Sequence, residues 1–309
     1  MLEVRALGGL EASIDGAPVG VATQKALELL CYLLLRQGRT IDRAVLAEHL
    51  WPMRPPGKAR RSLSTALWRL RCALRAAGPS KTIAPVLARG HTLALESSCE
   101  IDFDVWEFER RAAAGLTENA ADPRKRIRDL EVAAGLYGGP LLHGACSDWC
   151  LAERERMHLI HLRTLKGLLR GQDALGAFEQ AIDIGHRLLA IDPLQEDVHR
   201  DLMRCYASSG QRCLALEQYE QCRRTLRSEL RLDPMEETRE LERRIRSGAF
   251  PARTATDARR SRDAALLQFQ QALETLEASW QTLHDSPVGS LLGNVSEPPP
   301  PTALSGQPD

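Results

Sequence analysis

The chain has 309 residues, with 41 Lys or Arg against 41 Asp or Glu, so its formal net charge is zero. This length is enough for two domains, each with its own core. No apolar run approaches the roughly 18 residues of a membrane span, and the N-terminus lacks a signal-peptide pattern, which argues against membrane and secreted proteins. We therefore expect a cytoplasmic protein.

The charge is distributed unequally along the chain. Residues 1–95 contain 14 Lys or Arg against 6 Asp or Glu, whereas residues 96–309 contain 27 against 35. Residues 49–95 alone contain nine Lys or Arg and no acidic residue. A positive field of this extent is typical of a surface that meets a polyanion, and nucleic acid is the first candidate.

The N-terminal region begins with short strands and then turns helical. Residues 2–7 and 10–14 are alternating runs separated by two glycines, which predicts a small antiparallel sheet. A helix is predicted over residues 24–36, with Thr23 as its N-cap and apolar residues at helical spacing. A second, shorter helix is predicted over residues 42–50.

A third helix is predicted within the acid-free stretch. Two prolines in residues 53–57 fix φ and remove N–H donors, so we expect a loop there. From about residue 58 to 76, four leucines recur along one helical stripe, which predicts a buried face. Arg60 is expected nearer the protein side, and Ser64 and Arg75 on a flank. The side opposite the leucines carries Arg61, Thr65, Trp68, Arg69 and Cys72.

Two short β-like runs follow the third helix. Residues 83–88 and 91–95 flank Arg89-Gly90, and a two-residue loop ending in Gly favours a hairpin turn. The order of sheet, three helices and hairpin is that of a winged helix-turn-helix.

Such a domain binds DNA with its third helix in the major groove and an Arg-bearing loop in the minor groove. The arginines can neutralise phosphates or read guanine, and the hydroxyls can reach either backbone or bases. A merely solvated basic face is the alternative. Trp68 is expected either to contact a thymine methyl or sugar, or to cover the hydrophobic seam. The positive end of the first helix, with Thr23 and Lys25, is a further predicted phosphate contact. The predicted DNA-binding residues are Lys25, Arg61, Ser64, Thr65, Trp68, Arg69, Arg71, Arg75, Arg89 and His91.

From residue 102 to about 246 the sequence is nearly all amphipathic helix. An aliphatic-Asp-Pro triplet occurs at 191–193 and again at 232–234, and Ala181 aligns with Ala215 at an offset of 34, the period of the tetratricopeptide repeat. Seven extra positions before the second triplet are expected to form two helical turns. The predicted fold class is therefore mainly α, with a winged helix-turn-helix followed by an all-α, tetratricopeptide-like domain. Helices are predicted at 122–137, 149–169, 173–191, 195–208, 211–232 and 236–246.

The C-terminal part has a different composition. Residues 248–256 are predicted to be a linker, and residues 257–284 an amphipathic helix. That helix is expected either to pair with its copy in a second chain or to fold back on residues 236–246. Residues 285–309 include four consecutive prolines and little to bury, which predicts disorder.

No motif for catalysis stands out. The sequence lacks GxSxG, a Gly-rich phosphate loop and paired carboxylates beside a base, so we expect no enzyme activity, no catalytic residue and no cofactor. His158 and His161 lie three residues apart with Cys146 and Cys150 upstream, but this spacing does not supply a full metal-ligand set, and ordinary surface or core histidines are preferred. The eight cysteines form no CxxC pair and are expected to be buried or half-buried free thiols.

Several segments share a family pattern. In the N-terminal region they are LEVRALGGLEASIDG (2–16), Gln24-Lys25-Ala26, LAEHLWP (46–52) and ARRSLSTALWRLRCAL (59–74). Further on they are IDFDVWEFERR (101–111), LYGGPLLHG (136–144), DWCLAERERM (148–157) and the Asp-Pro repeats. Together, over about residues 1–247, they resemble the Streptomyces antibiotic regulatory protein family, in which an OmpR-type winged helix precedes a bacterial transcriptional activator domain.

The resemblance implies a transcriptional activator that binds direct repeats near promoters and contacts RNA polymerase. In that family the helix corresponding to residues 59–75 lies in the major groove, and the loop with Trp51, Met53 and Arg54 faces polymerase. The implied domains are 1–98 and 99–247, on a cytoplasmic, nucleoid-associated protein that can act as a homodimer or as tandem monomers. No GxxxxGK[ST] is present, so nucleotide switching is not expected. The alternative function is a protein-interaction scaffold whose basic domain docks on an acidic partner.

Overall fold

The computed structural model describes residues 1–20, 23–77, 86–95, 99–117 and 122–250, except for the side chains of residues 87 and 89. The predicted helix 257–284, the tail 285–309 and most of the predicted linker lie outside these residues. The described residues belong to one compact unit, Met1–Ala252. In this part of the chain, no helix has the length and apolar character needed to cross a membrane.

A four-stranded sheet opens the fold. Its order is β3-β2-β1-β7, with β1 and β2 antiparallel and β1 and β7 parallel. Successive side chains of a strand point to opposite faces of the sheet, and those at positions 2, 4, 12 and 14 face the core. The strands are β1 (Leu2–Arg5), β2 (Glu11–Ile14), β3 (Ala17–Pro18) and β7 (Ile101–Phe103). The antiparallel pair confirms the prediction, whereas β7 was not predicted and comes from beyond residue 98.

Gly8 follows β1 at a point of close backbone approach. It has φ +96°, and a Cβ there would lie 2.6 Å from the carbonyl carbon of Gly138. Its N–H donates to Pro140 O at 3.3 Å, while Leu142 N donates to Ala6 O at 2.9 Å. Only glycine fits this conformation and spacing without strain, and it lets the end of β1 approach the loop at residues 138–142.

The three helices of the winged helix-turn-helix lie where they were predicted. Asp42 caps α2 by accepting from Ala44 N at 2.7 Å. Thr23 occupies the N-cap position of α1 but makes no side-chain capping bond. The bounds are α1 (Gln24–Leu34), α2 (Arg43–Leu50) and α3 (Pro56–Ala77).

Two local predictions in this domain were wrong. α3 begins at Pro56, inside the segment predicted to be a loop, because a proline in the first turn loses only an N–H that has no helical partner. The wing hairpin β5 (Val86–Arg89) and β6 (Thr92–Leu95) turns at Gly90-His91, one residue later than predicted. Gly90 has φ +57° in the first turn position, where glycine is favoured. A third strand, β4 (Ile41–Asp42), joins β6 and was not predicted.

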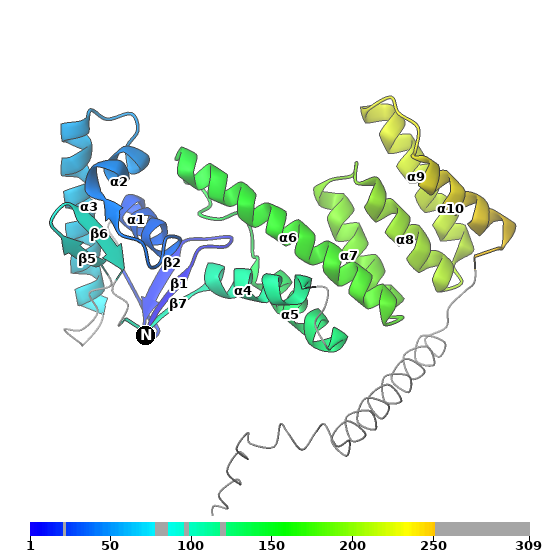
Figure 1. Ribbon diagram of the computed structural model, residues 1–309, viewed down its shortest axis with the longest axis horizontal. Helices are drawn as coiled ribbons and strands as arrows, with labels where there is room; N and C mark the ends of the chain where they lie inside the picture. Colours follow the sequence, from blue (N-terminus) through cyan, green and yellow to red (C-terminus); the bar gives the residue numbers. More distant parts are fainter. Residues whose placement is uncertain (21–22, 78–85, 96–98, 118–121, 251–309) are drawn as a thin grey trace, which may run out of the picture. The chain divides into compact units, whose positions relative to one another are not determined.

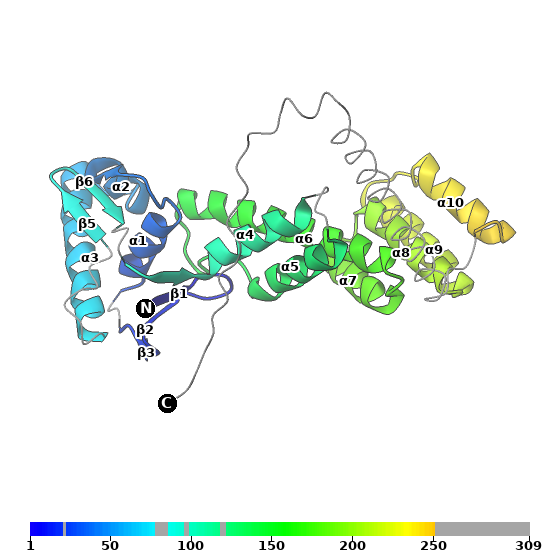
Figure 2. The same ribbon diagram turned by 60° about the horizontal axis from the view of Figure 1, so that its bottom comes forward.

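Within the described residues, seven helices follow β7. They are α4 (Asp104–Leu116), α5 (Pro123–Leu136), α6 (Asp148–Ala174), α7 (Phe178–Ile191), α8 (Glu196–Ser208), α9 (Arg212–Glu229) and α10 (Glu236–Ser247). Figures 1 and 2 show α6 to α10 as successive antiparallel neighbours, and the mainly α fold class is confirmed. Asp173 belongs to the end of α6 rather than to the start of α7, and Gly176 follows with φ +74°.

The tetratricopeptide-like pattern reflects real packing. Ala181 of α7 and Ala215 of α9 are both fully buried. The prediction that seven extra positions before the second Asp-Pro form two helical turns was only partly right. α9 is four residues longer than α7 (18 against 14), and residues 230–232 are not helical. Arg231 has φ +57° in that turn.

The first hydrophobic core continues across residue 98. It includes residues of β1, α1 and α3, and also Phe103, Phe108, Trp149 and Met157. The rings of Trp149 and Tyr32 of α1 pack in a T-shaped arrangement, with centroids 4.9 Å apart. The boundary at residue 98 stays a prediction, but the start of α6 is part of the same core as the helix-turn-helix.

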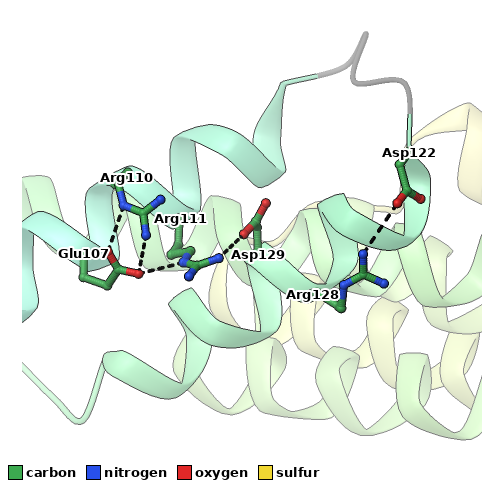
Figure 3. A network of polar contacts seen from close by, with 6 residues as sticks. All are labelled: Glu107, Arg110, Arg111, Asp122, Arg128 and Asp129. Carbon is green, nitrogen blue, oxygen red and sulfur yellow. Dashed lines mark hydrogen bonds and ion pairs between the residues drawn. The ribbon is translucent and has the colours of Figure 1, made fainter. Parts of the chain in front are cut away.

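An ionic network joins α4 to α5 (Figure 3). Arg111 donates to Glu107 on its own helix at 2.7 Å and to Asp129 on α5 at 2.6 Å. Hydrogen bonds from Arg110 and Arg111 lower the pKa of Glu107. Asp129 is buried, so the guanidinium supplies the charge partner that its carboxylate needs away from water.

Candidate nucleic-acid interface

α3 has one buried face and one exposed basic face, as predicted. The buried side chains are Ala59, Leu63, Ala66, Leu67, Leu70 and Leu74. The exposed predicted residues are Arg61, Ser64, Thr65, Trp68, Arg69 and Arg75. Arg60 is exposed too, which corrects its predicted place nearer the protein side. In the part of the chain that the structure describes, no Lys or Arg of α3 has a carboxylate within 4 Å. This face therefore presents net positive charge.

The hydroxyls among the arginines are ordered by the helix itself. Ser64 Oγ donates to Arg60 O at 3.1 Å, and Thr65 Oγ1 donates to Arg61 O at 3.1 Å. Arg43 of α2 donates to Ser64 Oγ at 3.2 Å. Sequence reasoning missed Arg43, because only the contact of α2 with α3 brings it to this surface.

Trp68 is 66% exposed. It therefore does not cover the hydrophobic seam, and that alternative is excluded. A large aromatic side chain held in solvent between Ser64 and Arg69 is costly to expose, and such exposure is typical of a contact surface.

The wing hairpin lies beside α3 (Figures 1 and 2). Arg71 is half-buried and donates to Val86 O of β5 at 3.2 Å, so it supports the wing. His91 is exposed at the turn, and its carbonyl accepts from Arg43 N at 2.9 Å. The side chain of Arg89 is not among those that the structure describes. α3 and the wing are thus connected directly, as one surface.

A hollow of about 510 Å³ lies between the exposed face of α3, the start of α1 and the loop after α2. We call it the basic hollow. Its charged lining residues are all cationic: Lys25, Arg54, Lys58, Arg61 and Arg69. Thr23, Ser62 and Thr65 add hydroxyls, and Trp51 adds an aromatic wall. Five cations and three hydroxyls around one concavity are suited to phosphate oxygens.

Three hydrogen bonds, two from Lys25 and one from Arg54, hold the rim of the basic hollow. Lys25 Nζ donates to Glu28 Oε2 at 2.6 Å and to Ser147 Oγ at 3.0 Å, so its ammonium is held from two sides. Arg54 donates to Ser62 Oγ at 2.7 Å. Arg54 was assigned only to the polymerase-facing loop, and the structure places it in the hollow as well. Lys58 was not assigned, although it lies in the acid-free stretch.

The loop between α2 and α3 carries two large apolar side chains, one packed on the core and one exposed. Trp51 is half-buried against the first core. Met53 is 94% exposed. A loop held by Trp51 and displaying Met53 has an apolar tip available to another macromolecule.

The histidines singled out by spacing lie apart from this interface. His161 is buried and stacks on Tyr137, with ring centroids 4.0 Å apart, and burial lowers its pKa to about 4. In the described residues no group of three or more His, Cys, Asp or Glu could hold a metal ion. The cysteines are free, but Cys72, Cys146 and Cys213 are exposed rather than buried or half-buried.

Two family descriptions match the chain in succession. Residues 19–93 match "Transcriptional regulatory protein, C terminal", and residues 103–246 match "Bacterial transcriptional activator domain". The first match contains α1 to α3 and both wing strands up to residue 93, and the second contains α4 to α9 and nearly all of α10.

Curated relatives are named as regulatory proteins or transcriptional regulators. The regulatory protein AfsR of Streptomyces coelicolor is 29% identical over 77% of this chain, which spans only 24% of AfsR. The transcriptional regulatory protein MoaR1 of Mycobacterium tuberculosis is 27% identical over 79% of each chain. The transcriptional regulator RedD of S. coelicolor is 27% identical over 75% of this chain and 67% of RedD.

A solved structure supports the fold. Mycobacterium tuberculosis EmbR, in complex with a low affinity phosphopeptide, superposes with a TM-score of 0.70 at 24% identity, over 87% of this chain and 71% of that one. These relatives are regulators and not enzymes. The ordered pair of domains and the named relatives establish that the chain belongs to the Streptomyces antibiotic regulatory protein family of transcriptional regulators, with an OmpR-type domain followed by a bacterial transcriptional activator domain.

Proposed function

We propose that this regulator is a sequence-specific DNA-binding activator that binds direct repeats near promoters and contacts RNA polymerase. The basic hollow is the single observation that carries DNA binding, because it joins three separate segments into one cationic, acid-free concavity beside α3. With α3 in the major groove, the hollow would receive phosphates of the flanking backbone and the wing would lie over the adjacent minor groove.

The predicted DNA-binding residues would have different roles in the complex. Arg61, Ser64, Thr65, Trp68 and Arg69 face outward on α3 and would contact bases and the nearest phosphates. Arg71 would act by supporting the wing, and Arg75, Arg89 and His91 would extend the contact toward the wing. Lys25 and the start of α1 would bind a phosphate at the far side of the hollow.

The proposed polymerase contact rests on the exposed tip at Met53. Met53→Ala should leave promoter affinity unchanged, because the side chain touches neither the core nor the basic hollow, and should reduce transcription in a purified polymerase assay. Equal transcription by Met53→Ala and the unchanged protein would contradict this contact.

Chromatin immunoprecipitation with sequencing, followed by anisotropy titration of an enriched fragment and its shuffled version, tests DNA binding. We expect enriched fragments with a direct repeat and clear preference for the native order of bases. Two copies on such a repeat require either a homodimer or tandem monomers, which sedimentation with and without DNA distinguishes. Equal affinity for native and shuffled fragments would contradict sequence-specific binding and favour the protein-interaction scaffold.

A further inference from the structure

A second hollow, of about 580 Å³, lies on the activator domain between α5 and α6. We call it the α5–α6 groove. Its floor is apolar, with Leu116 at the end of α4 and Ile127 and Leu130 of α5. Gly167 and Gly171 of α6 face this floor, and a Cβ on Gly171 would lie 2.9 Å from Ile127 Cγ1. The missing side chains let the helices pack closely and keep the α6 wall of the groove low.

The charged lining of the α5–α6 groove is entirely cationic. Arg126 comes from α5, and Arg163, Lys166 and Arg170 follow one stripe of α6 at positions i, i+3 and i+7. Carboxylates hold two of these cations from outside the lining, because Lys166 Nζ donates to Asp197 at 2.8 Å and Arg170 Nε donates to Asp201 at 3.2 Å. Lys166 and Arg170 are therefore already paired with carboxylates of α8.

Arg163 is the cation best placed for a ligand. It is exposed, and among the described residues it has no carboxylate within 4 Å. Arg126, by contrast, donates to Gly115 O at 3.3 Å. An arginine beside an apolar floor offers a forked donor for an anion whose body is hydrophobic.

We propose that the α5–α6 groove binds a small organic anion with an apolar body, such as a hydrophobic carboxylate or sulfonate. The size of the groove lies within the range of small-molecule sites, and its lining has the usual combination of apolar surface with a few convergent polar groups. The anionic group sits at Arg163 and the body lies on Leu116, Ile127 and Leu130. This inference goes beyond DNA binding and does not depend on it.

The test uses two fluorescent probes that differ only by a sulfonate group. 8-Anilinonaphthalene-1-sulfonate carries a sulfonate, and N-phenyl-1-naphthylamine is its neutral counterpart. Titrated into the full chain, the sulfonate probe should bind saturably at one site and more tightly than the neutral probe. Decanoate, a non-fluorescent apolar carboxylate, should displace it.

Three variants locate the site. Arg163→Gln should weaken binding of the sulfonate probe by at least about tenfold, the loss of one charge-assisted hydrogen bond, and leave the affinity for the neutral probe unchanged. Ala174→Phe fills the groove from an exposed position and should remove binding of both probes. Arg187→Gln removes an exposed α7 arginine outside the lining and should change neither.

Thermal melts by circular dichroism establish that each variant is folded. Arg163→Gln breaks no ion pair among the described residues, so it remains informative even where Ala174→Phe fails to fold. Absence of saturable sulfonate binding would overturn the proposal. Binding that survives both Arg163→Gln and a folded Ala174→Phe would place the probe elsewhere and overturn it equally.

Discussion

The Nζ atom of Lys25, at the start of α1, donates a hydrogen bond of 3.0 Å to Oγ of Ser147, at the N-cap of α6. The two residues are 122 positions apart, and one lines the basic hollow while the other begins the long helix of the activator domain. The same ammonium pairs with Glu28, whose side chain is only 4% exposed. Lys25 therefore has a structural partner on each side in addition to its proposed phosphate.

Lys25→Met should separate these roles. Alone it leaves the Glu28 carboxylate buried without its partner, and the free energy of unfolding should fall by about 1–3 kcal/mol in urea denaturation. Lys25→Met combined with Glu28→Gln removes the stranded charge and should recover most of that stability. DNA affinity should stay low in the stable double variant. Full recovery of DNA affinity there would mean that Lys25 acts only through folding.

Arg61 and Arg69 should each account for one phosphate contact. Replacing either with Ala should weaken DNA binding and lower the slope of log affinity against log salt by about 0.9, the value expected for one neutralised phosphate. Anisotropy titrations across a salt series measure this slope. Arg231→Ala, which removes an exposed arginine in the α9–α10 turn, is the control and should bind with the slope of the unchanged protein. An unchanged slope in both α3 variants would contradict the assignment of α3 to the DNA interface.

Trp68 should contribute to binding and not to stability. Because the side chain is 66% exposed, Trp68→Ala should change the free energy of unfolding by no more than about 0.5 kcal/mol. DNA affinity should fall in the same variant, and Trp68→Phe should restore part of it by supplying an aromatic face. A large stability loss in Trp68→Ala, with DNA affinity unchanged, would contradict this assignment.

The face of α3 could be predicted because it depends on local periodicity. Four leucines at helical spacing determine which side is buried, and the side opposite is then exposed whatever the neighbours are. The same reasoning failed at Arg60, which lies nearer the leucine stripe but has no neighbouring element over it. The choice between the two roles of Trp68 could not be made from the sequence either, since the exposure of its side chain depends on what packs beside α3.

The basic hollow could not be predicted, because it depends on tertiary contacts. Lys25 and Arg54 reach α3 only through the packing of α1 and the α2–α3 loop. The strands β4 and β7 have two and three residues, too few for a visible alternation, and they form because partner strands supply the hydrogen bonds. Arg71 illustrates the same limit, since its bond to Val86 O requires the wing to be in place.

The pair of Arg111 and Asp129 should be worth more than a surface ion pair (Figure 3). Arg111→Met leaves the buried Asp129 carboxylate without its guanidinium, and the free energy of unfolding should fall by about 1–3 kcal/mol. Arg111→Met with Asp129→Leu should recover most of the loss. The control is Arg128→Met, whose pair with Asp122 is exposed and 3.5 Å long, so its effect should stay within about 0.5 kcal/mol. Equal losses for Arg111→Met and Arg128→Met in urea denaturation would contradict the special role of the buried carboxylate.

His161 should make the protein less stable as the pH falls from 7 toward 5. Burial lowers its pKa to about 4 from an ordinary 6.5, with Arg187 and His158 adding to the effect, and the side chain is 6% exposed. Between those values the unfolded chain binds a proton that the folded chain does not, so the free energy of unfolding declines as pH decreases, by about 2 kcal/mol at pH 5.

His161→Phe tests this, because it keeps a ring against Tyr137 and cannot titrate. Nδ1 of His161 also has no hydrogen-bond partner within the described part of the chain, so the substitution breaks no bond there. Urea denaturation at a series of pH values should give a shallower dependence for the variant. The remaining slope should include His199, whose pKa is also lowered by burial. Parallel curves for the two proteins between pH 7 and 5 would mean that His161 is protonated in the folded state and is not the buried neutral group that its surroundings indicate.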